Sequence, residues 1–146
     1  MTALSAAARR SIRDPQQGRE LYIPMNASTT IYQGGLVCWD ADGYARAAAD
    51  TASFKIAGVA AETVTNSGAD GAASIRVVRG VTIPLSIQST SITIADIGYN
   101  AIVQDDNTVT DATTATNDIP VGVILDVDST DGAWVCVGVF APTNAP

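Results

Sequence analysis

The feature that most constrains the fold of this chain is a pattern that occurs twice. The segment Ile119–Phe140, IPVGVILDVDSTDGAWVCVGVF, contains two apolar runs rich in β-forming residues, joined by a polar turn. Around Gly58, the segment IAGVAAETVTNSGADGAASIRVVRGV has the same order of parts. Gly58 precedes Gly122 by 64 residues, since 122 minus 58 is 64. We therefore predict two related halves, at about 31–81 and 95–140.

The spacing of turn signals predicts the fold class. Gly, Asp and Asn clusters recur about every ten residues, and no amphipathic helix lies between them. The run Val81–Gln88 alternates apolar and polar residues and predicts a half-buried strand, in which Pro84 favours an edge position or a bulge. Ile92–Ile97 is a further candidate extended run. The sequence predicts an all-β fold, a small tulip-like β-barrel or β-sandwich, as one domain over 21–146.

The last strand of this domain differs from the others because both of its faces are apolar. One face carries Ala133, Val135, Val137 and Val139, and the other carries Trp134, Cys136, Gly138 and Phe140. Such a strand is either central in a sandwich or covered by another subunit. Under the second alternative, the candidates for an oligomer interface are Trp134, Val135, Val137 and Val139.

Charge divides the chain into a basic beginning and an acidic body. The first twenty residues carry four arginines against Asp14 and Glu20, a balance of +2 in a chain whose total is −7, so the rest carries −9. An acidic body without a basic stripe disfavours nucleic-acid binding by the folded part. Residues 1–20 are predicted to form an extended arm, either a solvated terminus or a segment that orders on a partner. Under the second alternative, the candidate contact residues of this arm are Arg9, Arg10, Arg13 and Arg19.

Hydropathy and cysteine usage indicate the cellular setting. No run of about 18 apolar residues could span a bilayer, and the first residues lack the apolar core of a secretory signal. We expect a soluble protein that is made in the cytoplasm and has no membrane partner. Cys38 and Cys136 lie inside apolar runs and are expected to be buried thiols.

The sequence offers little for catalysis. It contains no histidine, so serine and cysteine triads and the common zinc sites lack their usual base or ligand. Its single lysine, Lys55, does not follow a Gly-rich phosphate loop. The acidic turn Asp126–Asp131 has the wrong spacing for a calcium loop, and the pairs Asp40/Asp42 and Asp105/Asp106 are expected to tighten turns. We expect no catalytic residue, no cofactor and no metal.

Several short motifs carry a resemblance to a known family. They are Gly35-Leu36-Val37 followed by Asp42-Gly43, Ile56-Ala57-Gly58-Val59-Ala60, Gly98-Tyr99 and Ile119-Pro120-Val121-Gly122-Val123. Over Ile23–Phe140 the chain resembles the small capsid decoration, or cement, proteins of tailed phages. The resemblance implies a barrel-like β fold, no enzymatic activity, and binding as a symmetric oligomer, often a trimer, on the outside of an assembled head. The implied partners are the major capsid protein and other copies of the chain.

Other function classes remain open. A virion-surface domain that binds a host or a carbohydrate would present exposed aromatic residues, whereas Trp39 and Trp134 lie within apolar runs and are expected to be buried. A soluble inhibitor or adaptor is compatible with the sequence, and an enzyme is the weakest alternative.

Overall fold

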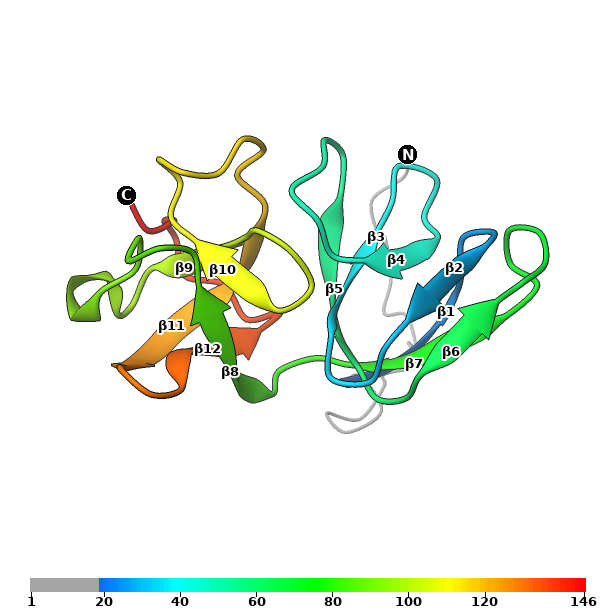
Figure 1. Cartoon of the computed structure of the whole chain (residues 1–146), viewed down its shortest axis with the longest axis horizontal. Coiled ribbons are helices and arrows are strands. Elements are labelled where there is room, and N and C mark those ends of the chain that lie inside the picture. Colours follow the sequence, from blue (N-terminus) through cyan, green and yellow to red (C-terminus); the bar gives the residue numbers. More distant parts are fainter. Residues whose placement is uncertain (1–18) are drawn as a thin grey trace, which may run out of the picture.

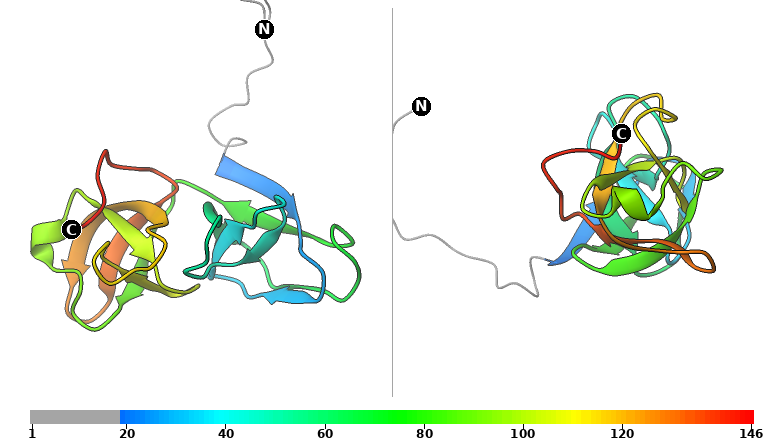
Figure 2. Two further views of the ribbon diagram at one scale, coloured as in Figure 1. Left: turned by 90° about the horizontal axis from the view of Figure 1, so that it is seen from above. Right: turned by 90° about the vertical axis from the view of Figure 1, so that its left-hand side faces the viewer.

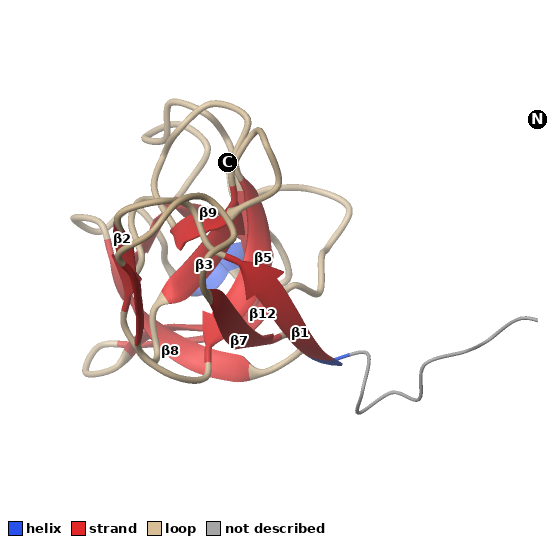
Figure 3. Cartoon of the chain, turned by 90° about the vertical axis from the view of Figure 1, so that its right-hand side faces the viewer, coloured by secondary structure: helices blue, strands red, loops and turns tan. Residues whose placement is uncertain are grey.

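Strands predominate in the computed structural model, which describes residues 19–146 (Figure 3). The all-β fold predicted from the sequence is confirmed. In the view of Figure 1 the strands form two halves that lie side by side along the long axis. The first half contains β1 (Glu20–Pro24), β2 (Thr29–Ile31), β3 (Leu36–Trp39), β4 (Ala45–Ala47), β5 (Lys55–Ala60), β6 (Val64–Asn66) and β7 (Ser74–Val78). The second half contains β8 (Thr82–Ile87), the 3-10 helix η2 (Ile94–Asp96), β9 (Asn100–Val103), β10 (Thr108–Thr110), β11 (Pro120–Asp128) and β12 (Gly132–Val137).

The two halves share one strand order. The sheet of the first half runs β1-β7-β5-β3-β4, and the second half is a closed barrel in which β8-β12-β11-β9-β10 follow in the same order. In the barrel, β10 and β8 close the ring through a parallel pairing that includes Val109 and Ile87. In the first half the same closure is reduced to one parallel bridge, between Met25 and Ala45. The predicted internal duplication is therefore visible in the topology.

The hydrogen-bond register repeats as well. Gly58 of β5 lies opposite Val37, and Gly122 of β11 lies opposite Ala101. The second pair is therefore the first pair shifted by the offset of 64 residues. Each strand is irregular at the same place, immediately before its glycine. The pairing of β1 with β7 matches that of β8 with β12; for example, the Leu21–Val77 pair corresponds to Ile83–Val135.

The boundaries of the halves differ from the prediction. The second copy begins at β8, the equivalent of β1, whereas the sequence placed this strand between the copies. The first copy likewise begins earlier than predicted, at Glu20, the last residue of the predicted arm of residues 1–20. The first copy also contains an insertion, the antiparallel pair β2 and β6, which has no counterpart in the barrel.

Strand β8 is not an edge strand, because β12 and β10 flank it on both sides. Pro84 lies opposite Trp134 without a register shift, so the predicted bulge is absent there. Because β10 pairs only with Ser86 and Ile87, Pro84 has no strand neighbour on that side, and its missing N–H leaves no ladder bond unmade. The predicted extended run Ile92–Ile97 is instead a turn with η2, whose capping box joins Thr93 and Asp96.

Apolar packing joins the halves into one folded unit. Leu36, Cys38, Ile56 and Val59 of the first half belong to the same buried cluster as the interior of the barrel. The opposite face of the first sheet has its own cluster, which includes Val37 and Val77. The sheet of the first half is therefore covered on both faces, and Figure 2 shows the two halves packed end to end.

Polar contacts reinforce the junction between the halves. The backbone N–H of Leu36 donates to the Asp106 carbonyl at 2.8 Å, and that of Gly80 donates to the Val137 carbonyl at 2.7 Å. The carboxylate of Asp50 accepts the backbone N–H groups of Thr116 and Asn117 at 2.7 and 2.8 Å.

Candidate functional site

Of the predicted arm residues, Arg9, Arg10 and Arg13 lie outside the residues that the structure describes. Arg19 is described and belongs to the folded body. Its Nη2 donates to the Gly80 carbonyl at 3.2 Å, and its own carbonyl accepts the backbone N–H of Arg79 at 2.7 Å. These bonds tie Arg19 to the connection between β7 and β8.

The closing strand β12 separates the predicted interface residues into two groups. Val135 and Val137 are fully buried inside the barrel, so their assignment to an oligomer interface is corrected: they are core residues of the chain itself. The closure of the barrel explains their burial, because alternate residues of each strand must point to its interior. Trp134 is half-buried on the outer face. Val139 and Phe140 lie beyond the strand, each 47% exposed.

The 3-10 helix η2 lies at the end of the barrel farthest from the first half (Figures 1 and 2). Exposed apolar residues belong to this helical turn and to the segments beside it. This group, the end patch, consists of Ile94, Ile97, Tyr99 and Leu125, whose side chains are between 39% and 73% exposed. The N–H of Gly98 donates to the Ile124 carbonyl and the N–H of Ile124 donates to the Tyr99 carbonyl, both at 2.9 Å, which brings the two segments together.

Sequence reasoning missed the end patch because Ile92–Ile97 was interpreted as an extended run. The signal that could have revealed it is the Thr93-x-x-Asp96 spacing of a capping box. A single helical turn there leaves Ile94 and Ile97 without a sheet to pack on.

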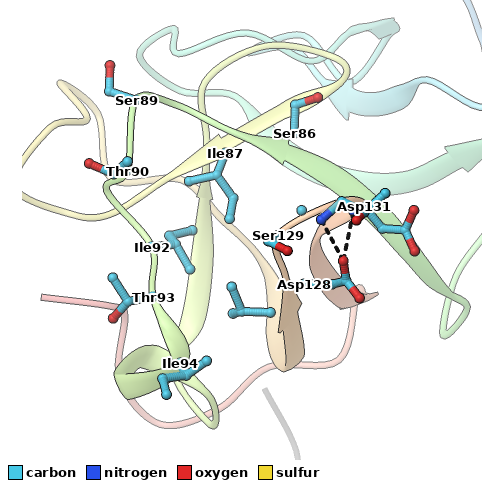
Figure 4. A pocket seen from close by; sticks show the side chains of 13 residues that line it. Ser86, Ile87, Ser89, Thr90, Ile92, Thr93, Ile94, Asp128, Ser129 and Asp131 are labelled. Carbon is cyan, nitrogen blue, oxygen red and sulfur yellow. Dashed lines mark hydrogen bonds between the residues drawn. The ribbon is translucent and has the colours of Figure 1, made fainter.

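A hollow of the barrel half has a volume of about 780 Å³ (Figure 4). The Ser89–Thr93 segment lies on one side of it and the Asp128–Asp131 turn on the other. Its lining alternates isoleucines with hydroxyl groups and the carboxylates of Asp128 and Asp131, and it contains no basic side chain. It can therefore exchange hydrogen bonds with a polar ligand, but its lining supplies no general base stronger than a carboxylate.

The carboxylate of Asp128 is already engaged in its own turn. It accepts the backbone N–H groups of Thr130 and Asp131 at 2.6 and 3.2 Å (Figure 4), and the bond from Thr130, then that from Asp131, lowers the pKa of Asp128. Within residues 19–146, no three acidic, cysteine or histidine side chains gather as a possible metal site.

Asp40 and Asp105, from the two predicted aspartate pairs, also tighten turns. Asp40 accepts the N–H groups of Asp42 and Tyr44 and pairs with Arg46 at 3.1 Å. Burial raises the pKa of Asp40, but these bonds and the guanidinium outweigh it, so the net shift is downward. Asp105 accepts the N–H of Asn107 at 2.8 Å. The predicted turn role is confirmed for Asp40, Asp105 and Asp128.

The two thiols have different surroundings. Cys38 is fully buried in the shared core, and burial raises the pKa of its thiol to about 12. Cys136 is half-buried on the outer face of β12. The predicted burial is confirmed for Cys38 and is partial for Cys136.

Comparisons with models of protein families, with curated proteins and with solved structures found no match for this chain. In the part of the chain that the structure describes, no helix is long and apolar enough to cross a bilayer.

Proposed function

We propose that this protein is a structural virion protein that binds the outer surface of an assembled phage head as a symmetric oligomer, a trimer, and stabilises the capsid. Its partners are the major capsid protein and further copies of itself, and it is made in the host cytoplasm. It has no catalytic role. The observation that carries the proposal is the end patch: four exposed large apolar residues on two hydrogen-bonded segments at one end of an elongated β molecule.

Covering this patch by another protein is energetically favourable. Single exposed apolar residues are common, whereas several on neighbouring segments are typical of a surface that another molecule covers. Burial contributes about 25 cal/mol for each Å² of apolar surface removed from water. Tyr99 adds a phenol that can keep a hydrogen bond at the rim of such a contact.

Contacts between copies have different candidates. Unlike the core residues Val135 and Val137, Trp134 is half-buried and Val139 is exposed, and Phe140 continues the exposed segment. The N–H of Val123 donates to the Val139 carbonyl at 2.8 Å, so this segment is held against β11. In a trimer in which Trp134 and Val139 contact the next copy, the interface is formed by the rigid strand β12 and the segment that follows it.

The arm supplies the second contact with the head in this proposal. Arg9, Arg10 and Arg13 can form bidentate bonds with carboxylates of the capsid, which a strongly acidic body would otherwise repel. In an oligomer, the arms bind in concert, so weak individual contacts add to a large avidity.

Co-sedimentation with undecorated phage heads tests the proposal. The double variant Ile94→Ser, Leu125→Ser should lose head binding, and deletion of residues 1–18 should weaken it in a salt-dependent manner. Tyr32→Ser is the matched control, because Tyr32 is 65% exposed but belongs to the first half. Equal loss in the control would show that binding is not specific to the end patch. Full binding by the double variant would contradict the proposal.

A second candidate is a host- or carbohydrate-binding domain of a virion. The hollow between Ser89–Thr93 and Asp128–Asp131 favours it, since hydroxyl and carboxylate groups are suited to the hydroxyls of a sugar. Calorimetric titration with a panel of oligosaccharides tests this, with Thr90→Val and Ser129→Ala as variants that remove hydroxyls from the hollow. If an oligosaccharide gives a heat of binding with the unaltered protein and none with the variants, that result would favour this function over capsid decoration.

A further inference from the structure

A second hollow, of about 290 Å³, lies where the two halves meet. We refer to it as the junction hollow. Trp39, Phe54, Lys55 and Arg79 line it from the first half, and Pro120 and Phe140 line it from the second. Ile56 and Ile119 complete the lining, so three of its eight side chains are aromatic and two are cationic.

The aromatic side chains provide an apolar surface that the fold leaves partly open. Trp39 and Phe54 are half-buried, and Phe140 is 47% exposed. Since an apolar cavity of roughly 150 Å³ holds a benzene molecule, the junction hollow has room for one bulky side chain and a small polar group.

The two cations are unusual in this acidic body. Of the five basic residues in 19–146, Arg46 forms an ion pair with Asp40 and Arg76 forms one with Glu20, each at 3.1 Å. Two of the other three, Lys55 and Arg79, line the junction hollow. No carboxylate lines it, so positive charge concentrates at an apolar surface without compensation from the described residues.

The guanidinium of Arg79 is held in place before any ligand arrives. Its Cζ lies 5.8 Å from the centroid of the Trp39 ring, within the range of a cation–π interaction. Its Nη2 donates to the Gly138 carbonyl at 3.3 Å. A Cβ at Gly138 would lie 2.8 Å from Nε of Arg79, so only glycine leaves space for the guanidinium here. A guanidinium has five N–H donors, and an orientation fixed by the protein lowers the entropy lost on binding.

We infer that the junction hollow binds a segment of a partner polypeptide in which a carboxylate side chain adjoins an aromatic or branched aliphatic one. The carboxylate bonds to Arg79 and Lys55, and the apolar side chain packs among Trp39, Phe54 and Phe140. The charge of the hollow selects an anion. Its aromatic surface selects an apolar neighbour for that anion.

The size of the hollow favours a polypeptide over a free carboxylate. Small-molecule sites enclose most of their ligand, whereas the junction hollow accepts about one side chain and opens to the surface. A segment of chain can place one side chain in the hollow and gain further affinity from the surfaces on either side, which a free carboxylate cannot reach.

Trp39 allows a direct assay. Because the chain has two tryptophans, the full-length Trp134→Phe variant contains Trp39 as its only tryptophan. Its fluorescence is titrated with a blocked octapeptide that carries an Asp-Phe pair between glycines and serines, and with the same peptide carrying Asn-Phe. We expect saturable binding of the first peptide and roughly tenfold weaker binding of the second, the loss that about 1.4 kcal/mol represents.

Two variants test the cations. Arg79→Gln should weaken binding of the Asp-Phe peptide by about tenfold or more. Arg19→Gln is the matched control, since Arg19 also donates to a glycine carbonyl but does not line the hollow, and it should leave binding unchanged. If Arg79→Gln fails to fold, Lys55→Gln replaces it as the test variant, because Lys55 is exposed. Its binding of the Asp-Phe peptide, together with that of the Asn-Phe peptide to the unaltered hollow, then tests the inference.

The inference is overturned if the Asn-Phe peptide binds as well as the Asp-Phe peptide, or if a folded Arg79→Gln variant, or Lys55→Gln in its place, binds normally. It is also overturned if phenylacetate alone binds as tightly as the peptide, because the hollow is then a site for a free carboxylate. The assay contains no phage head, so its result is independent of the proposed capsid function.

Discussion

Gly58 and Gly122 make the same close approach in the two halves of the molecule. A Cβ at Gly58 would overlap the carbonyl oxygen of Val78, and a Cβ at Gly122 would overlap the carbonyl oxygen of Cys136. Val78 and Cys136 are themselves equivalent residues, since each lies opposite the residue that follows the glycine. Each repeat thus requires glycine where two neighbouring strands come closest.

Replacing either glycine should destabilise the fold. Gly58→Ala and Gly122→Ala each force a methyl group into backbone, so we expect a loss of about 1–3 kcal/mol or more in the free energy of unfolding, measured in urea. Gly35→Ala is the control, because its nearest neighbour, the Tyr32 carbonyl oxygen, is 3.2 Å from the added Cβ, and the loss there should be smaller. Equal losses at all three positions would contradict the close-approach argument.

Acid should weaken the junction between the halves through Asp50. Burial raises the pKa of Asp50, but the bonds from Thr116 and Asn117 outweigh it and lower the pKa below its usual value of about 3.9. Because the folded-state pKa is the lower one, the stabilisation is fully present above the unfolded-state pKa and is lost as pH falls through the folded-state pKa. Asp50→Asn should therefore flatten the dependence of the free energy of unfolding on pH below about 4. Asp42→Asn is the control, since the described bonds assign Asp42 no role at the junction, and an unchanged slope in Asp50→Asn would contradict the prediction.

Val137 and Val139 should respond oppositely to an introduced charge. Val137→Asp places a carboxylate in the barrel core, which costs several kcal/mol, so the variant should not fold, as judged by circular dichroism. Val139→Asp should fold normally, because Val139 is exposed. If Val139 contributes to an oligomer, sedimentation velocity should detect a smaller species for Val139→Asp than for the unaltered protein. An unchanged oligomer would exclude Val139 from the interface.

The thiol of Cys38 should be inert in the folded protein. Burial disfavours its thiolate, with a pKa of about 12, and the thiolate is the reactive form. In a Cys136→Ser variant, a disulfide reagent at pH 8 should label Cys38 only after denaturation. Labelling of the native variant at the rate of a free thiol would contradict the burial of Cys38.

The sequence predicted the duplication well where the spacing is constant. From β3 to β5, the offset of 64 residues relates the two copies without a break, so Gly58 and Gly122 could be matched directly. The match failed at β1 and β8 because the insertion of β2 and β6 changes the spacing of the flanking strands. Leu21 and Ile83 occupy equivalent positions, but without the constant offset their apolar character is the only feature of the sequence that relates them.

The candidate site was less predictable because it depends on closure and on local capping. Alternation in β12 separates two faces but cannot tell which face points into a barrel. The sequence therefore offers Val135 and Val137 as interface candidates, although they lie in the core. The junction hollow brings Trp39 and Arg79 together with Phe140, far along the chain, and no local pattern encodes that meeting.

The single bridge between Met25 and Ala45 gives the two halves different local dynamics. In the barrel each of the five strands has two neighbours, so no strand can detach without breaking pairs on both sides. In the first half, the bond from the Asn26 N–H to the Ala45 carbonyl, at 3.1 Å, is the described backbone link across the equivalent seam. Transient rupture of that seam releases β4 on one side while β3 still holds it on the other. Amide protons along β4 should accordingly exchange with solvent through local fraying, whereas those along β10 should exchange only through a larger cooperative opening of the barrel.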